Sequence, residues 1–588
     1  MSPSDPELPR NDRLALVILA VAQSLALLLL HKSLTHDVWP STDPRWLYAL
    51  YTVAIGLPLF LYAGAVRWRD HHNAYAAGAL AVLLFWVGWH AGWLTTSEFE
   101  QTKRNSESGP GFIFSIAIAL FIAGFYFRSW REAGRLDYAK LLDNSWRNAL
   151  TLGFLIGFLA VFWVLLALWA SLFKVIGIDF FAELFIRSEF IYPVFGLVGG
   201  WGLGLIRARV GLVATVRRLC EVLIRALLPL VAFILIIFLG TLPATGLEKL
   251  WDTGYASFLL LALAVVLLFF FNAMVADDEA ISMHRLLLPL VLAALVVVPA
   301  NSGLAAWAMG LRVDQYGWTV DRLWGGFVIL FVALYSLGYA AIVLRHRGMD
   351  LAAMRRLNIA LGAALAIALF AVNTPLIEFH RIAAKSQVER LVAGRTKVAD
   401  FDAHYLRFDL GPYGIAELEA LRASDFAKAQ PGLVAMITDA LNAKSRWYDA
   451  VESVRSDPAA LRTRFVALPG TELDDEFLQA LVAARANAGN VGYCFQGKVV
   501  CAVGEFVYRG QRYRAQTSNP PYASGQVWRH GDAGWTRIGS LRQFGCPDKT
   551  PAEVDTTSPF TPIESEFFVV KNGACLYQVL PERGALAP

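Results

Sequence analysis

Two acidic side chains in one short hydrophilic loop are the strongest candidates for chemistry in this sequence. Asp37 and Asp43 lie in the segment THDVWPSTDPRW, which directly follows the first long apolar run. A carboxylate at the edge of a membrane can act as a general base or hold a divalent metal beside a phosphate leaving group. Acidic side chains in hydrophilic loops are also commonly just solvated, so both interpretations of the pair stay open.

The reaction that such a pair would serve is sugar transfer from a lipid-linked donor. Multi-pass glycosyltransferases of this kind are similar in outline, with many spans, acidic residues in an early outer loop and a C-terminal domain outside. Signatures of other enzyme classes are absent from the sequence, which contains no Walker-type phosphate loop, no GxGxxG between a strand and a helix, no HExxH and no GxSxG. We therefore expect no cofactor and favour a protein without enzymatic activity.

Two histidines lie near groups that elsewhere bind metals or relay protons. His404 is close to Asp400 and Asp402, but capping of a surface helix explains this group better than a metal site, because no fourth ligand is nearby. His90 lies among tryptophans towards one end of an apolar segment, which is typical of an interfacial anchor. No series of Asp, Glu or His crosses the apolar segments, which argues against a proton-coupled transporter. We predict no metal site.

The cysteines divide between the two halves of the chain. Cys220 is alone in the apolar half, whereas Cys494, Cys501, Cys546 and Cys575 lie near the C-terminus. An even number of cysteines in a domain outside the cytoplasm predicts two disulfides, and we favour Cys494 with Cys501 and Cys546 with Cys575. Zinc is disfavoured because no CxxC pair occurs and the spacing is irregular, and free thiols are the remaining alternative.

The composition indicates the class of protein that carries these candidate residues. The 588 residues are 56% hydrophobic and 17% charged, and the mean hydropathy is +0.47. These values predict a polytopic membrane protein with the lipid bilayer as its partner. Much of the net charge of +4 lies in short loops between apolar segments, where it orients helices, so we do not expect a nucleic-acid partner.

Eleven apolar segments are long enough to span a hydrocarbon core of roughly 30 Å. Arginines in alternate loops favour a cytoplasmic N-terminus, and an odd number of spans then places the C-terminus outside. The acidic loop from Asp277 to Ala280 fits this orientation least well. The predicted spans are Leu14–Leu30, Leu47–Val66, Ala74–Leu94, Phe112–Phe127, Ala149–Phe173, Phe190–Ile206, Val222–Gly240, Ala256–Ala276, Leu286–Met309, Leu323–Leu344 and Leu357–Leu376.

Two spans contain residues that change how helices pack. Gly196, Gly200 and Gly204 form a small-residue ridge that lets another helix approach closely, either within the chain or at a hinge or homodimer interface. Pro299, Asn301, Ser302 and Gly303 interrupt the apolar pattern of the ninth span. They predict either a kink that neighbouring helices accommodate or a broken helix that lines a polar cavity, as in transporters.

The composition becomes soluble after Leu376. Apolar residues three and four apart predict helices at first, and short alternating runs such as GEFVYRGQRYRAQ predict β-hairpins from residue 491 onward. The expected fold is an all-α polytopic membrane bundle followed by an α+β extracytoplasmic domain with a small antiparallel sheet. Its parts are a cytoplasmic tail (1–13), the transmembrane domain (14–376), a mainly helical periplasmic subdomain (377–490) and a β-rich, disulfide-containing periplasmic subdomain (491–588).

Three stretches resemble a bacterial multi-pass membrane family known as domain of unknown function 4153. They are DNSWRNALTLGFLIGFLAVFWVLLALWASLFKVIGIDFF, RVDQYGWTVDRLWG and QVERLVAGRTKVADFDAHYLRFDLGPYGIAELEAL. The resemblance covers roughly residues 140 to 430 and implies an inner-membrane location, with no established activity and no catalytic residues to transfer. The cysteine-bearing tail lies outside it.

These observations favour an integral protein of the bacterial inner membrane that senses or scaffolds an envelope component through a periplasmic domain. Its partner would be an envelope protein or a lipid-linked glycan, and the oligomeric state is open. The alternatives are a glycosyltransferase using Asp37 and Asp43, and a transporter built around Pro299 to Gly303.

Overall fold

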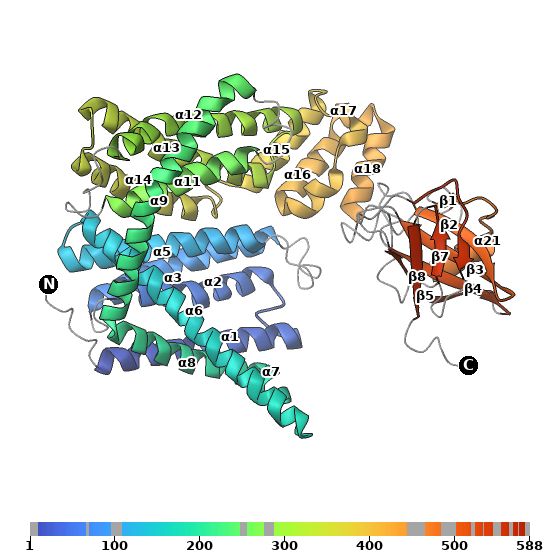
Figure 1. Ribbon diagram of the computed structural model, residues 1–588, viewed down its shortest axis with the longest axis horizontal. Coiled ribbons are helices and arrows are strands. Elements are labelled where there is room, and N and C mark those ends of the chain that lie inside the picture. The colour runs from blue at the N-terminus through green and yellow to red at the C-terminus, as the bar shows by residue number, and fades with distance from the viewer. Residues whose placement is uncertain are drawn as a thin grey trace. The chain divides into compact units, whose positions relative to one another are not determined.

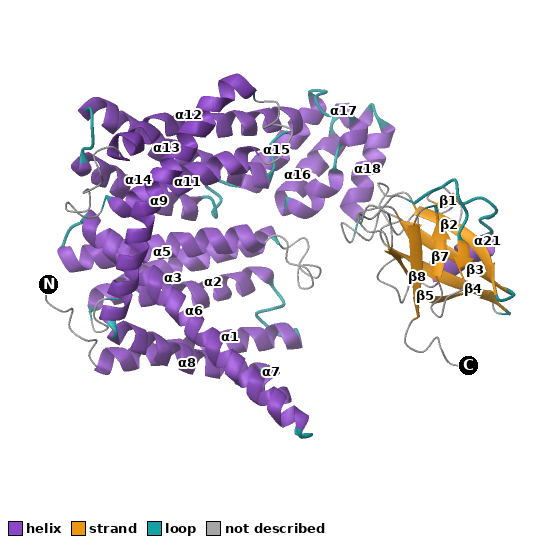
Figure 2. Cartoon of the chain, in the orientation of Figure 1, coloured by secondary structure: helices purple, strands orange, loops and turns teal. Residues whose placement is uncertain are grey.

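The computed structural model describes residues 10–65, 70–95, 109–246, 256–275, 287–443, 462, 465–483, 501–518, 524–532, 534–544, 554–563, 569–573 and 575–581. Its contacts divide the chain into two compact units, Met1–Thr438 and Asp439–Pro588. The first unit is helical and the second is built on a sheet (Figures 1 and 2). Each unit has its own buried core.

Among the described residues, eleven helices are long and apolar enough to cross a membrane, as predicted. Their most apolar windows are only 17% to 44% buried inside the protein, so most of their surface is left for lipid and the chain is an integral membrane protein. The helices are α1 (Arg10–His36), α2 (Pro44–Gly64), α3 (His71–Leu94), α5 (Gly109–Ala133), α6 (Tyr138–Val175), α8 (Ser188–Ala208), α9 (Val210–Thr245), α11 (Ala256–Met274), α12 (Leu287–Tyr316), α13 (Val320–His346) and α14 (Leu351–Ala371).

The spanning helices pack as two groups. In the first group α2 packs between α3 and α5, and α1 packs on α8, so that these five helices run side by side (Figure 1). In the second group α9, α11, α12 and α13 surround the largest apolar core, which includes Leu267, Phe271 and Tyr339. Two further helices join the groups, because α14 packs on both α5 and α13, and α6 contacts α5, α8 and α9.

The glycine ridge of α8 packs against α1 within the chain. A Cβ on Gly200 would lie 2.9 Å from the Cα atom of Val17, and one on Gly196 would meet Ser24. Gly204 is buried, and a Cβ there would lie 3.9 Å from the Cβ of Arg13. At Gly196 and Gly200 an added Cβ would overlap atoms of α1, so these two glycines permit the close approach of the helices, whereas the space at Gly204 would accommodate a Cβ.

The proline in the ninth span does not break the helix, because α12 continues from Leu287 through Pro299 to Tyr316. Asn301 is fully buried and its Nδ2 donates to the carbonyl of Leu260 at 2.7 Å. The hydroxyls of Ser302 and Ser336 lie 3.0 Å apart, which joins α12 to α13. Gly303 lies on the exposed side of α12, with no atom within 4 Å of an added Cβ.

Two groups of shorter helices complete the first unit. Between α6 and α8 lies α7 (Phe180–Ile186), and none of its residues is buried. After the last span come α15 (Phe379–Val392), the short turns η2 (Val398–Asp400) and η3 (Tyr405–Asp409), α16 (Gly411–Ala423), α17 (Asp425–Lys428) and α18 (Pro431–Asn442). Apolar periodicity predicted the α-helices here, and the first compact unit ends within α18, at Thr438.

The second unit contains an eight-stranded sheet in the order β1-β2-β3-β4-β5-β8-β7-β6, in which only the β1–β2 pair is parallel. The predicted hairpin GEFVYRGQRYRAQ forms β2–β3, and β4–β5 and β7–β8 are further antiparallel pairs of consecutive strands. Arg509 and Gly510 both have positive φ in the first turn, as a tight hairpin requires. The strands are β1 (Phe465–Ala467), β2 (Cys501–Tyr508), β3 (Gln511–Ser518), β4 (Ser524–Gly531), β5 (Gly534–Phe544), β6 (Thr561–Ile563), β7 (Val569–Asn572) and β8 (Cys575–Pro581).

Both faces of this sheet are covered by apolar side chains. On one face, Phe477 of α21 (Asp475–Ala483) packs edge-on against Trp528 and Trp535. The other face holds a second core around Phe506 and Tyr577. The antiparallel α+β domain expected from the sequence is therefore confirmed, with a larger sheet than predicted.

The domain boundaries predicted from the sequence were placed where the compartment or the composition changes. The contacts between residues in the structure instead divide the chain into two units after Thr438. The helices α15 to α17 belong to the compact unit of the bundle, and α21 belongs to that of the sheet. Cys501 and Cys575 are buried at the starts of β2 and β8. Cys501 is disulfide-bonded, whereas Cys575 is not part of a disulfide, so the predicted pairing of Cys546 with Cys575 is wrong. Cys494 and Cys546 lie outside the described residues, so the pairing of Cys494 with Cys501 remains a prediction.

Candidate functional site

A buried carboxylate lies just after the last span. Glu378 is 2% exposed and caps α15, where its Oε1 accepts a hydrogen bond from the backbone N–H of His380 at 3.1 Å. An acidic side chain at this position stabilises a helix by satisfying a free N–H and by facing the positive end of the helix dipole.

Imidazoles bind this carboxylate from both sides. His380 places Nδ1 2.7 Å from Oε1, and His90 of α3 bonds to Oε2 through Nε2. His90 is only 6% exposed, so it lies inside the protein and the predicted role as an interfacial anchor does not describe it. Both imidazoles donate to ionised Glu378, which fixes the proton of His90 on Nε2 and that of His380 on Nδ1.

Aromatic rings cover the histidine from α3. The ring of Trp93 stacks on His90 with centroids 5.8 Å apart, and Tyr413 of α16 packs edge-on against Trp93 at 5.2 Å. Apolar cover strengthens the electrostatic contact beneath it and makes an unpaired charge there costly. The site thus holds one negative charge between two donors in a dry environment.

The environment of Glu378 keeps it ionised. Burial by itself would raise the pKa of this carboxyl, but hydrogen bonds from His380 and His90 outweigh burial and lower the pKa to about 2. Because the folded pKa lies below the ordinary value of 4.5, the stabilisation is fully present above about pH 4.5 and is lost as the pH falls towards 2.

The lowered pKa of Glu378 predicts how the stability of the protein depends on pH. Replacing Glu378 with Gln removes the titrating group, so the difference in thermal stability between wild type and variant should persist above pH 4.5 and shrink between pH 4.5 and 3. The measurement is the unfolding midpoint of the detergent-solubilised full chain at each pH. A difference that grows as the solution is acidified would contradict the assignment.

A second contact set joins α15 to the turn between α12 and α13. Arg390 is 8% exposed, and its Nη2 donates to the carbonyl of Gln315 at 2.9 Å, while Nη1 lies 3.5 Å from that of Val313. Both carbonyls lie in the last turn of α12, and that of Val313 also accepts from the N–H of Gly317 at 2.8 Å. The guanidinium therefore caps that helix and complements its dipole.

Neighbouring residues of α15 bind the same turn. Gln387 donates from Nε2 to the carbonyls of Tyr316 and Trp318, at 3.1 and 2.8 Å, and Trp318 N–H donates to the hydroxyl of Ser386 at 3.2 Å. Gly317 has φ +76°, and a Cβ there would overlap the Arg390 side chain. We call the residues His90, Glu378, His380, Ser386, Gln387 and Arg390, with the turn from Val313 to Val320, the junction.

The structure places the predicted acidic pair in the loop that leads into α2. Asp43 caps α2 through the N–H of Arg45 at 2.9 Å, and its Oδ2 forms an ion pair with Arg45 Nη2 at 2.8 Å. The hydrogen bond from that side chain lowers the pKa of Asp43. Asp37 is exposed with φ 50° in the same loop. Arg45 thus occupies the carboxylate that a metal or substrate would need.

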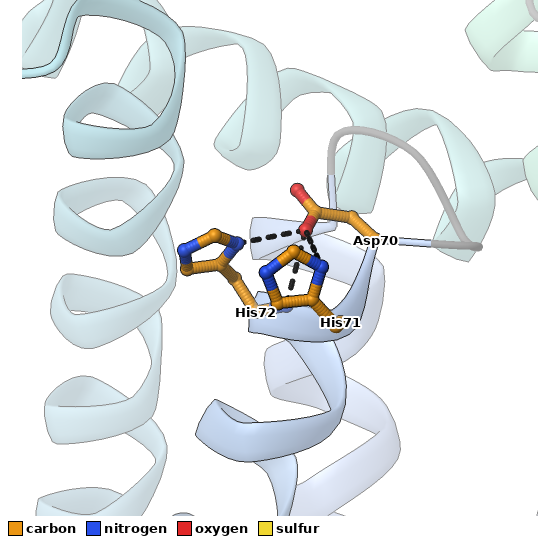
Figure 3. Close-up of side chains that lie close together, drawn as sticks. All are labelled: Asp70, His71 and His72. Carbon is orange, nitrogen blue, oxygen red and sulfur yellow. Dashed lines mark hydrogen bonds and ion pairs between the residues drawn. The ribbon is translucent and has the colours of Figure 1, made fainter.

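Another group has the composition of a metal site. Asp70, His71 and His72 at the start of α3 have ligand atoms within 4.8 Å of one another, and Figure 3 shows both rings turned towards the Asp70 carboxylate. However, Asp70 caps α3 through His72 N–H at 3.0 Å and also forms an ion pair with Arg131. Arg131 supplies the positive charge that a cation would bring, so we assign this group a structural role.

Capping also explains the acidic residue beside His404. Asp402 Oδ1 accepts from the N–H of Tyr405 at 2.8 Å, which confirms the interpretation made from the sequence. The sequence alone did not predict the junction, because Glu378 and His90 are 288 positions apart in the chain. The available signal was a glutamate placed directly before a helix-forming run and just after the last span.

A family model described as "Domain of unknown function (DUF4153)" matches residues 18–421. The matched segment contains every residue of the junction and ends within α16. No curated protein and no solved structure matches the chain.

Proposed function

Because the chain belongs to the family described as a domain of unknown function, DUF4153, we propose its function from the geometry of its own side chains. The protein is a non-enzymatic scaffold or sensor of the bacterial inner membrane. Its bundle and post-membrane helices form one base, and the second unit, on the periplasmic side, engages an envelope protein or a lipid-linked glycan.

The ionised, buried Glu378 carries this proposal. One of its oxygens binds a histidine of the bundle and the other binds a histidine of α15. Removing one partner of such a pair leaves an uncompensated buried group and costs about 3 to 5 kcal/mol. Hydrogen bonds of this strength between Glu378 and the two histidines would hold the post-membrane helices in one position relative to the bundle, as a scaffold requires.

The orientation rests on charge. Arg128, Arg131 and Arg135 lie at the end of α5 opposite the junction, and Arg345, Arg347, Arg355 and Arg356 flank the start of α14. Positive residues favour the cytoplasmic side, so the junction faces the periplasm. An oxidising compartment there supports the disulfide pairing Cys494–Cys501.

One observation favours the transporter alternative. Asn301 is fully buried in the bundle, and its Oδ1 has no hydrogen-bond partner in the part of the chain that the structure describes. A free acceptor inside a membrane bundle is costly and commonly marks a water or ligand position. The glycosyltransferase alternative has no comparable support, since Arg45 occupies Asp43.

Complementation of a deletion strain tests the proposal. We expect the double variant Asp37→Asn, Asp43→Asn to complement the envelope defect of the deletion strain. We expect Glu378→Ala not to complement this defect, although the variant protein reaches the membrane at wild-type level. Glu389→Ala is the matched control, because this glutamate lies on the same helix with its side chain 65% exposed. Full activity of Glu378→Ala together with an inactive double variant would overturn the proposal in favour of the transferase.

A further inference from the structure

A hollow lies where α7 meets the start of α8. It has a volume of about 680 Å³ and is lined by Leu184, Arg187, Glu189 and Phe190. Pockets that bind small molecules typically measure roughly 300 to 1,000 Å³, so the hollow is large enough for a ligand. Its lining combines two charges of opposite sign with two apolar side chains, which fits a ligand that carries both charges and an apolar part.

Aromatic and apolar side chains around the hollow indicate its depth in the membrane. The ring of Phe190 lies 5.0 Å from that of Phe185 in α7, which packs edge-on against Trp169 of α6 at 5.8 Å. Phe180 and Ile186 of α7 are 61% and 76% exposed. Because α7 joins the spanning helices α6 and α8, such exposed apolar and aromatic side chains are most stable at the boundary between headgroups and acyl chains. The hollow therefore lies at the level of lipid headgroups.

The charged groups at the hollow are held by exposed ion pairs. Arg187 Nη2 lies 3.8 Å from Glu183 Oε2, and the two side chains are 63% and 67% exposed. Glu189 pairs with Lys32 of α1, and these side chains are 57% and 37% exposed. Exposed pairs contribute little to stability, so these groups can bind a ligand instead at small cost. The two positive and two negative side chains sum to zero charge, which favours a zwitterionic ligand over an anion.

The headgroup that matches this lining has a phosphate beside a primary ammonium. The planar fork of arginine binds two phosphate oxygens, and a carboxylate accepts hydrogen bonds from an ammonium. We propose that the hollow binds the headgroup of phosphatidylethanolamine, with its phosphate on Arg187, its ammonium on Glu189 and its apolar end against Leu184 and Phe190. Phosphatidylcholine has no N–H group to donate to Glu189, and phosphatidylglycerol has no cation, so neither headgroup satisfies both charges.

Native mass spectrometry of the detergent-solubilised full chain tests this site. The chain is titrated with phosphatidylethanolamine, phosphatidylcholine or phosphatidylglycerol that carry the same acyl chains. We expect the wild type to bind phosphatidylethanolamine most tightly. Arg187→Gln should weaken its binding by about tenfold, because a charge-assisted contact to the phosphate is lost. Glu189→Gln should weaken it by a similar factor and remove the preference over phosphatidylcholine, because only the ammonium contact is lost.

The controls make the same charge changes in an exposed ion pair of α15. Lys385 and Glu389 are 67% and 65% exposed and 3.7 Å apart, so Lys385→Gln matches Arg187→Gln and Glu389→Gln matches Glu189→Gln. Both controls should bind all three lipids like the wild type. Equal binding by each variant and its control would overturn the site. A preference for phosphatidylglycerol that is lost in Arg187→Gln would overturn the zwitterionic ligand.

Discussion

Glu378→Ala is expected to detach α15 from the bundle. The change removes two charge-assisted hydrogen bonds to imidazoles and the cap of the helix, and it leaves buried His90 without its partner. Together these losses amount to about 3 to 5 kcal/mol of local stability. Hydrogen exchange in α15 of the full chain should therefore accelerate by at least about a hundredfold.

Glu389→Ala serves as the control for this measurement. This glutamate is on the same helix, and its ion pair with Lys385, at 3.7 Å, is exposed. Exposed pairs contribute about 0 to 1 kcal/mol, so exchange should change by less than about fivefold. Equal exchange in Glu378→Ala and Glu389→Ala would show that the buried carboxylate does not hold α15.

Arg514→Met is expected to destabilise the sheet of the second unit by a similar amount. Arg514 is 1% exposed and bonds Asp474 at 2.6 Å and Glu505 at 2.8 Å. Its guanidinium also lies over the rings of Phe477 and Trp535, at 4.9 and 4.4 Å. Burial would raise the pKa values of both carboxyls, yet the hydrogen bonds they accept, Arg514's among them, hold them below the ordinary range.

Methionine fills much of the space but leaves two carboxylates without their buried partner. We expect a loss of about 3 kcal/mol, which corresponds to about a hundredfold faster exchange in β2 and β3. Arg512→Met is the matched control on the same strand. Its side chain is 51% exposed, although it also pairs with Glu505 at 2.8 Å. Similar exchange in the two variants would contradict a special role for Arg514.

Local patterns in the sequence predicted most of the architecture. Each span follows from its own apolar length, and the hairpins follow from alternation around turns such as Arg509–Gly510. The sequence did not decide whether the helix continues through Pro299, because a proline breaks or only kinks a helix depending on the helices packed around it. Here the contacts of Asn301 and Ser302 with adjacent helices keep α12 continuous.

The candidate sites depend on contacts that no local pattern encodes. The stretches RVDQYGWTVDRLWG and QVERLVAGR both belong to the family resemblance, yet nothing in either predicts that Arg390 caps the helix ending near Gln315. Such contacts join residues far apart in the chain, and one sequence does not reveal which residues they are.

The most direct test of the junction is a double-mutant cycle between His90→Ala and Glu378→Ala. Opening free energies of α15 are measured by hydrogen exchange on the full chain in lipid nanodiscs for wild type, both single variants and the double variant. Because the two side chains share one buried bond, we predict a coupling energy of about 2 kcal/mol, with the double variant little worse than Glu378→Ala. Effects that add within about 0.5 kcal/mol would contradict the claim that this pair locks the post-membrane helices to the bundle.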